Sequence, residues 1–248
     1  MAADSSRQRI RIGTAGWSLY KPPAARFPDK GSHLERYAAT FDAVEINSSF
    51  YRPHKPETYA RWAASAPAGF RFAVKLPRTI THEHRLVDCE KLVERFAGEV
   101  VHLGEKRGPV LIQLPPSLVF DLPRADRFFG LAREILGDMM VCEPRHASWF
   151  TAQADALLVE HQVARVAADP APVPGAADPG GWPGLRYARL HGSPRIYWSH
   201  YDAAAIERHA AAAGAAQVEN WTIYDNTASG AALGNALEML DRVNAIRN

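Results

Sequence analysis

Eight short apolar segments of strand length recur along this chain, and most of them are followed by a polar loop and a segment with helical spacing. Their starts lie roughly 20 to 40 residues apart, which leaves room for a crossover helix between consecutive strands. Such an alternation predicts an α/β fold with parallel strands. The predicted strands cover residues 10–15, 43–47, 71–76, 109–114, 140–143, 164–169, 185–191 and 221–226.

Helical spacing predicts a helix after most of these strands, and two of the helices carry clear start signals. Ser32, with Glu35 three residues later, forms a capping-box pattern, and Pro56 suits the first turn of a helix. Residues 170–184 are rich in proline and glycine, so we expect a loop that replaces or shortens the sixth helix. The predicted helices cover residues 32–41, 56–66, 90–105, 124–136, 151–160, 203–213 and 228–245.

Parallel strands of this number can close into a barrel or form an open, doubly wound sheet. An open nucleotide-binding sheet usually carries a glycine-rich phosphate loop, and neither G-x-G-x-x-G nor G-x-x-x-x-G-K-[ST] occurs in the chain. The length of 248 residues suits one barrel domain of about 250 residues. We therefore predict a single parallel (β/α)8 TIM barrel over residues 1–248, with residues 1–8 as a disordered N-terminal tail.

Charge and hydropathy exclude several classes of protein. A formal net charge of +2 argues against a protein that coats nucleic acid or anionic membrane with its whole surface. The chain has neither an apolar segment of membrane-spanning length nor the apolar centre of a secretory signal, so we expect a cytoplasmic protein without a membrane partner. Cys89 and Cys142 fit no metal or disulfide pattern, and we expect both to be reduced and structural. No motif implies a cofactor or an oligomeric state.

Polar residues within the predicted strands cluster at the carboxyl ends. Side chains alternate between the faces of a strand, so Glu45 and Asn47 share one face, as do Arg189 and His191. A barrel gathers these strand ends around one mouth, where the active sites of this fold lie. Because burying many ionisable groups is costly, the pattern indicates a functional pocket or an ion-pair network. The residues concerned are Glu45, Asn47, Lys75, Gln113, Glu143, Arg145, His146, Arg189, His191, Asp225 and Asn226.

We assign these side chains to two roles. Glu45 and Glu143 could act as general acid and base if their environments separate their pKa values, with His191 and Lys75 as further catalytic groups. Arginine in particular suits the geometry of a phosphate or carboxylate ligand. The predicted ligand-binding residues are Asn47, Gln113, Arg145, His146, Arg189, Tyr197, Asp225 and Asn226. The alternatives are a structural salt bridge for each glutamate and a loop cap for His146.

Six sequence blocks carry a more specific resemblance. In chain order they read EINSSFYRPHKPETYARW, FRFAVKLPRTITHEHRL, GPVLIQLPPSL, CEPRHASWF, YARLHGSPRIYWSHY and IYDNTASGAALGNA. Together they resemble the bacterial domain of unknown function 72 family, the YecE-like proteins, over residues 13–236. The resemblance implies a TIM barrel of unassigned biochemistry, with the strand-end residues named above, apart from Asp225, at the family's motif positions. Asp225 and Asn226 stand where the family commonly has two asparagines, which adds an acidic group.

Three hypotheses about function follow. The first is an enzyme, a hydrolase or isomerase, that acts on an anionic (phosphate- or carboxylate-bearing) or sugar-like small molecule by general acid/base chemistry at the mouth. The second is a metal-assisted variant, with Glu45, Glu143 and His191 as the principal ligands and with Lys75 and the arginines opposing a cation. The third is a non-catalytic binder of an anionic ligand or of single-stranded nucleic acid, which the near-neutral charge disfavours.

Overall fold

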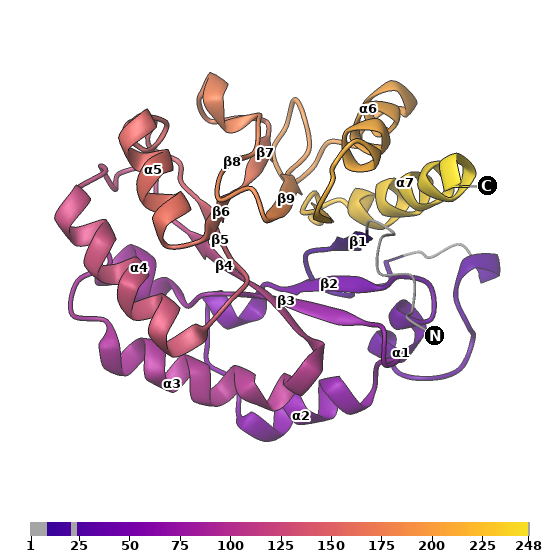
Figure 1. Ribbon diagram of the computed structural model, residues 1–248. Helices are drawn as coiled ribbons and strands as arrows, with labels where there is room; N and C mark the ends of the chain where they lie inside the picture. The colour runs from indigo at the N-terminus through magenta and orange to yellow at the C-terminus, as the bar shows by residue number, and fades with distance from the viewer. Residues whose placement is uncertain (1–8, 21–23, 248) are drawn as a thin grey trace, which may run out of the picture.

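The computed structural model describes residues 9–20 and 24–247 and shows parallel strands surrounded by helices (Figure 1). The predicted tail, residues 1–8, lies outside the described residues. All eight predicted strands are present, with bounds that differ by a few residues and with the sixth divided in two. The strands are β1 (Ile10–Thr14), β2 (Ala43–Ile46), β3 (Arg71–Lys75), β4 (Arg107–Gln113), β5 (Met140–Glu143), β6 (Val163–Arg165), β7 (Ala167–Asp169), β8 (Gly180–Gly181), β9 (Leu185–Leu190) and β10 (Glu219–Tyr224).

The helices begin where the sequence signals predict. Ser32 and Glu35 form the capping box of α1, and Pro56 lies in the first turn of α2. Among the described residues, no helix has the length and apolar character needed to cross a membrane. The α-helices are α1 (His33–Ala38), α2 (Pro56–Ala64), α3 (Glu90–Val100), α4 (Leu122–Leu136), α5 (Ala152–Glu160), α6 (Ala203–Gly214) and α7 (Ala231–Arg247). The shorter turns are η1 (Ala24–Arg26), η2 (Ser48–Phe50), η3 (Thr79–Glu83), η4 (Val101–Lys106), η5 (Ala147–Trp149) and η6 (Pro174–Ala176).

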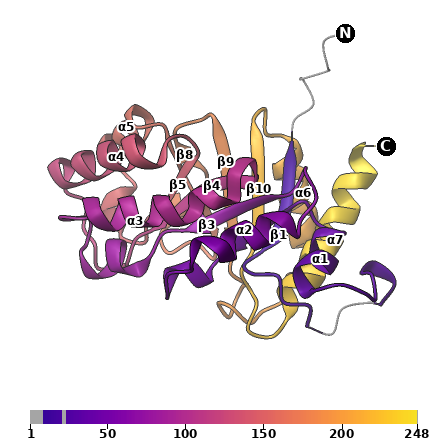
Figure 2. The ribbon, with the colours of Figure 1, turned by 90° about the horizontal axis from the view of Figure 1, so that it is seen from below.

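The strands form two sheets, with the orders β1-β10-β9-β7 and β2-β3-β4-β5-β6-β8. Every neighbouring pair is parallel except β6 and β8. Figure 2 shows β9, β10 and β1 side by side, with helices packed around the strands. The structure therefore confirms an α/β fold with parallel strands, although its backbone ladder forms two sheets where the sequence predicts one closed barrel.

A side chain replaces the backbone ladder between β1 and β2. The Tyr37 hydroxyl accepts from the Thr14 N–H at 2.9 Å and donates to the Ala43 carbonyl at 3.1 Å, so it lies between the two strands. A Cβ on Gly13 would come within 2.2 Å of the Ala43 carbonyl oxygen, which explains the glycine at this close approach. The strands meet again where Ala15 pairs with Glu45. The first break in the ladder is therefore a bridge through a buried phenol.

The second break lies at the divided sixth strand. β6 pairs with β5, whereas β7 pairs with β9, and between them the Val166 N–H donates to the Cys142 carbonyl at 2.9 Å. The other edge of β6 is covered by β8, which comes from the segment between β7 and β9 and runs antiparallel to β6. Because β8 occupies this edge, β9 pairs only with β7 on this side.

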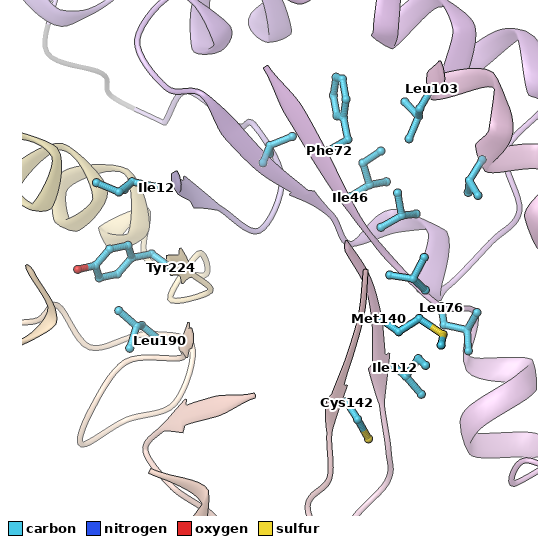
Figure 3. Close-up of a cluster of buried hydrophobic side chains, with 14 of the residues drawn as sticks. Ile12, Ile46, Phe72, Leu76, Leu103, Ile112, Met140, Cys142, Leu190 and Tyr224 are labelled. Carbon is cyan, nitrogen blue, oxygen red and sulfur yellow. The ribbon is translucent and has the colours of Figure 1, made fainter. Parts of the chain in front are cut away.

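The apolar core has two parts that follow the alternation of side chains along the strands. On the helix-facing side, Ile46, Phe72 and Ile112 belong to a large buried cluster with side chains of the surrounding helices (Figure 3). A smaller cluster contains Ala43, Tyr187 and other residues of alternate parity from the same strands. On the face of the strands that carries this smaller cluster, the residues nearest the carboxyl ends are charged or polar.

Candidate functional site

On five strands, a charged or amide side chain follows an apolar or aromatic interior residue by two positions. The spacing of two keeps both side chains on the same face, so the polar residue extends the interior cluster toward the carboxyl end. All five polar residues are buried. The pairs are Ala43 and Glu45 on β2, Ala73 and Lys75 on β3, Leu111 and Gln113 on β4, Val141 and Glu143 on β5, and Tyr187 and Arg189 on β9.

Arg189 is the centre of this polar layer and is fully buried. Its guanidinium makes a bidentate pair with Glu45, with Nε–Oε2 at 3.0 Å and Nη2–Oε1 at 2.8 Å. It also donates to Glu143 at 2.6 Å and to Asp225 at 2.8 Å. Glu45 accepts a further hydrogen bond from the Tyr187 hydroxyl at 2.8 Å. One guanidinium therefore holds three carboxylates, which come from β2, β5 and the end of β10.

His191 joins two of the same carboxylates. Its Nδ1 lies 3.0 Å from Asp225 and its Nε2 lies 3.1 Å from Glu143. A carboxylate accepts hydrogen bonds, so both ring nitrogens serve as donors when the imidazole is charged. Burial would lower the pKa of His191, but the charge of Glu143 and the hydrogen bonds to Asp225 and Glu143 raise it. His191 is therefore part of the network, with both ring nitrogens occupied.

Glu143 is surrounded by donors. Besides Arg189 and His191, it accepts from Gln113 Nε2 at 3.3 Å and from Arg145 Nη2 at 3.1 Å. Burial would raise the pKa of Glu143, but the charges of Arg189 and His191 outweigh burial and hold this pKa well below its ordinary value. The pKa of Asp225 is lowered in the same way, against its burial, by Arg189 and His191. Glu143 is therefore an ionised anchor in this geometry, which does not favour the general-acid role considered for it.

Lys75 differs from these groups because its ammonium has no protein partner. The residue is 4% exposed, and its Nζ makes no hydrogen bond or ion pair with any described residue. Its nearest aromatic contact is the Phe50 ring, whose centroid lies 4.1 Å from Nζ. Burial, together with the charge of Arg189, lowers the pKa of Lys75 to about 8. The amine can therefore gain and lose a proton close to neutral pH.

Several cations lie near Lys75. Burial lowers the pKa of His82, and the positive charges of Lys75, Arg78 and Arg145 lower it further. Arg78 also pairs with Glu83 at 3.2 Å. The Arg145 side chain is 27% exposed, and its Nη2 lies 3.4 Å from the Tyr197 hydroxyl. The three carboxylates that Arg189 binds are buried, while Arg145 is the most exposed charged group in contact with them. This distribution of charge suits an anionic ligand.

Three further predicted ligand-binding residues lie outside the network. Asn47 is half-buried, and its side-chain oxygen has no hydrogen-bond partner. The Asn226 amide donates to the Ser199 carbonyl and to the Asn235 side chain, away from Asp225. His146 Nδ1 accepts from the Ser148 backbone N–H at 3.2 Å, so His146 caps η5, the alternative that its position had suggested.

Sequence reasoning missed the contributions of Tyr187 and His82. Tyr187 lies two positions before Arg189, so the alternation of the strand could have placed it on the interior face. His82 lies in η3, and no strand period locates it. Its ring contacts Phe50 edge to face, with centroids 5.0 Å apart, so His82 and Lys75 share that aromatic neighbour.

The network is not arranged as a metal centre. In the part of the chain that the structure describes, no three histidine, cysteine, aspartate or glutamate side chains form a group that could hold a metal ion. Glu45, Glu143 and His191 do meet in one network, but the guanidinium of Arg189 lies between the two glutamates and donates to both. A cation at this point would have to displace an internal positive charge.

Fold and site together define the class of this molecule as an α/β protein with parallel strands and a buried charged network at their carboxyl ends. Residues 11–248 match the model of a family described as protein of unknown function DUF72, and the chain belongs to this family. The membership confirms the resemblance seen in the six sequence blocks.

Two named bacterial relatives match part of the chain. Over 108 residues the chain is 36% identical to the UPF0759 protein YecE of Escherichia coli strain K12, a stretch that covers 44% of this chain and 38% of YecE. Over 154 residues it is 29% identical to the UPF0759 protein YunF of Bacillus subtilis, covering 57% of this chain and 52% of YunF. The matches thus span between about two fifths and half of the relatives' lengths.

Solved structures share the fold at low sequence identity. A DUF72 family protein of Enterococcus faecalis superposes with a TM-score of 0.80 at 22% identity, over 95% of each chain. A DUF72 family protein of Thermotoga maritima gives 0.77 at 22% identity, over 96% of this chain and 100% of the other. A sugar phosphate isomerase/epimerase of Parabacteroides distasonis gives 0.55 at 13% identity, over 97% and 96%. These likenesses concern the fold.

Proposed function

We propose that the two parallel sheets form one (β/α)8 barrel, in which the segment between β7 and β9 replaces the sixth helix, and that its mouth is an active site. The Tyr37 bridge and the Ala15–Glu45 pair connect one side of the ring, and the continuous chain through Val166 connects the other. Active sites of such barrels lie at the carboxyl ends of the strands, where the charged network of this chain gathers. The proposed activity is proton transfer on a small anionic or sugar-like molecule.

The free amine of Lys75 carries this proposal. Arg189, Glu143 and Asp225 are each fixed by two or more hydrogen bonds, whereas Lys75 Nζ has none within the described residues. Leaving an ammonium buried without a partner costs free energy, and a structural lysine at this point could pair with a carboxylate instead. A group that the fold leaves unpaired is available to a ligand.

The remaining residues define what Lys75 would do. In its neutral form the amine accepts a proton from a substrate carbon or hydroxyl, and in its charged form it returns a proton, so one residue can serve both halves of an isomerisation. Arg145, which is partly exposed and fixed to Glu143, would hold the substrate's phosphate or carboxylate. Glu143, Asp225 and His191 would orient Lys75 and Arg145. The two carboxylates would also balance part of the positive charge of these residues.

The charge of the site suggests the class of substrate. One structural neighbour has a name that refers to the same class. Arg145 is the most exposed charged group of the network, and a guanidinium suits a phosphate or a carboxylate. The Parabacteroides distasonis neighbour is named for sugar phosphates, and its likeness to this chain is one of fold. We therefore place sugar phosphates and sugar acids first among candidate substrates.

Hydrogen exchange in deuterated water tests the proposal even where the product is unidentified. Wild-type protein is incubated with a panel of sugar phosphates and sugar acids, and proton NMR records the loss of carbon-bound hydrogen. Exchange should fall by about 10²-fold or more in Lys75→Met, because general base catalysis contributes factors of this size. The matched control is Lys91→Met, which alters an exposed lysine on α3.

Two outcomes would reject the assignment. Exchange that persists in Lys75→Met would exclude Lys75 as the base. Saturable binding of panel members without exchange or turnover would favour a binding protein. Repeating the panel with added Mg²⁺, Mn²⁺ and Zn²⁺ tests the metal-assisted variant, which requires activation by one of these ions.

A binding function has one observation in its favour. Tyr51, Tyr197 and Trp198 expose 68%, 38% and 46% of their surface, and Arg195 lies over the Trp198 ring at 4.5 Å. Exposed aromatic and basic residues can stack on unpaired bases. Fluorescence titration with a single-stranded oligonucleotide tests this function, and salt-dependent binding that Trp198→Ala weakens would support it.

A further inference from the structure

A cavity of about 330 Å³ lies outside the strand interior, behind β7, β9 and β10 and against α6. Alternate residues of β9, namely Arg186, Ala188 and Leu190, line it, so it opens on the face opposite to Arg189. Its volume falls at the lower end of pockets that hold small molecules. None of the residues assigned to the charged network lines this cavity.

The connection from β7 to β9 contributes one residue, Ala177, to the lining of this cavity. Within residues 170–184 the structure has η6 and β8 and no α-helix that could cover the outer face of β7 and β9. Arg165 holds this connection toward α5, since its guanidinium donates to Asp155 at 3.0 Å and to the Gly175 carbonyl at 2.7 Å. The space that a sixth crossover helix would fill is therefore lined by small residues and left open.

The polar lining points to a ligand. Asn220 is 1% exposed; its Oδ1 accepts from Thr222, while its amide nitrogen has no partner among the described residues. This nitrogen retains contact with solvent, so water or a molecule bound in the cavity can accept a hydrogen bond from it. Arg186 is half-buried and, like Arg208, makes no ion pair with any residue that the structure describes.

The charges and the floor of the cavity define the class of that ligand. Arg186 and Arg208 are positive and Asp169 is negative, so the lining has a net positive charge while His209 is neutral. Burial lowers the pKa of His209, which keeps it neutral near pH 7. The other walls are largely alanine, at Ala167, Ala188 and Ala212. We propose that this cavity is a second binding site, for a small molecule that presents a carboxylate or phosphate to Arg186 and Asn220 and an apolar body to the alanines.

Calorimetric titration with inorganic phosphate and with benzoate tests the site and separates the two anion types. Arg186→Gln should weaken binding of the better probe at least tenfold, because it removes the cation and keeps the length of the side chain. Ala188→Leu should abolish binding, because the larger side chain occupies the cavity. The matched control is Arg127→Gln, an exposed arginine on α4, which should leave the affinity unchanged.

Lys75→Met separates this site from the mouth, since it should leave binding in the cavity intact whatever its effect on proton transfer. Thermal melts of each variant establish that it is folded. Absence of binding of both probes to the wild-type protein would overturn the proposal. So would binding that both cavity variants retain, or binding that disappears in Lys75→Met.

Discussion

Two buried arginines lie at opposite ends of the strands and differ in the number and the exposure of their ion-pair partners. Arg11, on β1 at the amino ends, is 2% exposed and donates to Glu219 at 2.7 Å, with Asp42 at 3.7 Å. The Glu219 and Asp42 side chains are 30% and 48% exposed. Arg189, at the carboxyl ends, holds three carboxylates that are 6% exposed or less.

The difference separates a structural ion pair from a functional candidate. At the amino ends, Arg11 also donates to the Gly69 carbonyl and lies over the Trp221 ring, so ordinary packing accounts for it. At the carboxyl ends, the fold gathers three carboxylates around one guanidinium and leaves the amine of Lys75 without a protein partner among the described residues. Buried ion pairs stabilise a fold little relative to their desolvation cost, which makes this network a candidate functional site.

The two ends are physically connected. Trp221 donates to Glu219 at 3.0 Å and stacks on Tyr187, with centroids 6.0 Å apart, and the Tyr187 hydroxyl donates to Glu45. A column of aromatic rings therefore runs from the pair at Arg11 to the network around Arg189. The two ends therefore differ in how exposed the carboxylates are and in how many of them each arginine binds, although both arginines belong to one packed interior.

The largest effect should come from exchanging the two arginines in turn for methionine. Arg189→Met leaves three buried carboxylates without their cation and should lower the free energy of unfolding by about 3–5 kcal/mol. Arg11→Met leaves carboxylates that water can solvate and should cost only about 1–2 kcal/mol. Urea denaturation of both variants measures the difference.

Equal losses of unfolding free energy in Arg189→Met and Arg11→Met would contradict the difference between the two ends. If Arg189→Met does not fold, the double variant Glu45→Gln, Arg189→Met offers a second measurement, because it removes one of the unpaired charges. It should recover part of the lost stability.

A stability gain should accompany loss of the amine at Lys75. Because burial lowers the pKa of this residue from 10.5 to about 8, the folded protein bears a cost while the amine is charged. Lys75→Met should therefore raise the free energy of unfolding by roughly 2–3 kcal/mol near neutral pH. The unfolded chain binds more protons than the folded one between the two pKa values, so the wild type recovers stability as pH rises through that window.

Urea denaturation of the wild type and of Lys75→Met across this pH window measures the recovery. A gain that stays constant with pH would show that packing of methionine, and not relief of the buried charge, is the cause. Lys91→Met again serves as the exposed control, with no change expected.

The smallest effect should come from Asp225→Asn, which keeps an acceptor and removes one of three charges on Arg189. Stability should fall by about 1–2 kcal/mol. The pKa of His191 should fall as well, since Asp225 is one of the groups that raise it. A raised histidine pKa contributes stability below the ordinary value of 6.5 that is lost as pH rises through the folded value, so the variant should lose that contribution at lower pH. Imidazole NMR titration checks this, and an unchanged His191 pKa would remove Asp225 from the network.

The sequence predicted the strands and most of the charged network for one physical reason. Side chains alternate with a period of two, and parallel strands bring their carboxyl ends together, so Glu45, Lys75 and Arg189 could be located before any coordinates. The same rule shows why Asp225 and Asn226 separate: adjacent residues of an extended chain face opposite sides, and only Asp225 reaches Arg189.

Other features depend on contacts that no period encodes. That Arg189 binds all three carboxylates while Lys75 has no protein partner among the described residues depends on how side chains from different strands pack against one another. The division of the sixth strand depends on the return of β8 to β6, through a segment in which the sequence indicated only a loop. Cys89 and Cys142 are buried and form no disulfide, in agreement with the sequence prediction.

The phenol of Tyr37 gives the first strand junction a property that a peptide ladder lacks. Every residue except proline carries the same N–H and C=O groups, so most substitutions leave the hydrogen-bonding groups of a ladder unchanged. A junction made by a side chain can be lengthened, shortened or deleted by one codon change on α1. Because Glu45 follows Ala43 by two residues on β2, a change of the Tyr37 side chain can alter the spacing of β1 and β2 beside a carboxylate of the charged network.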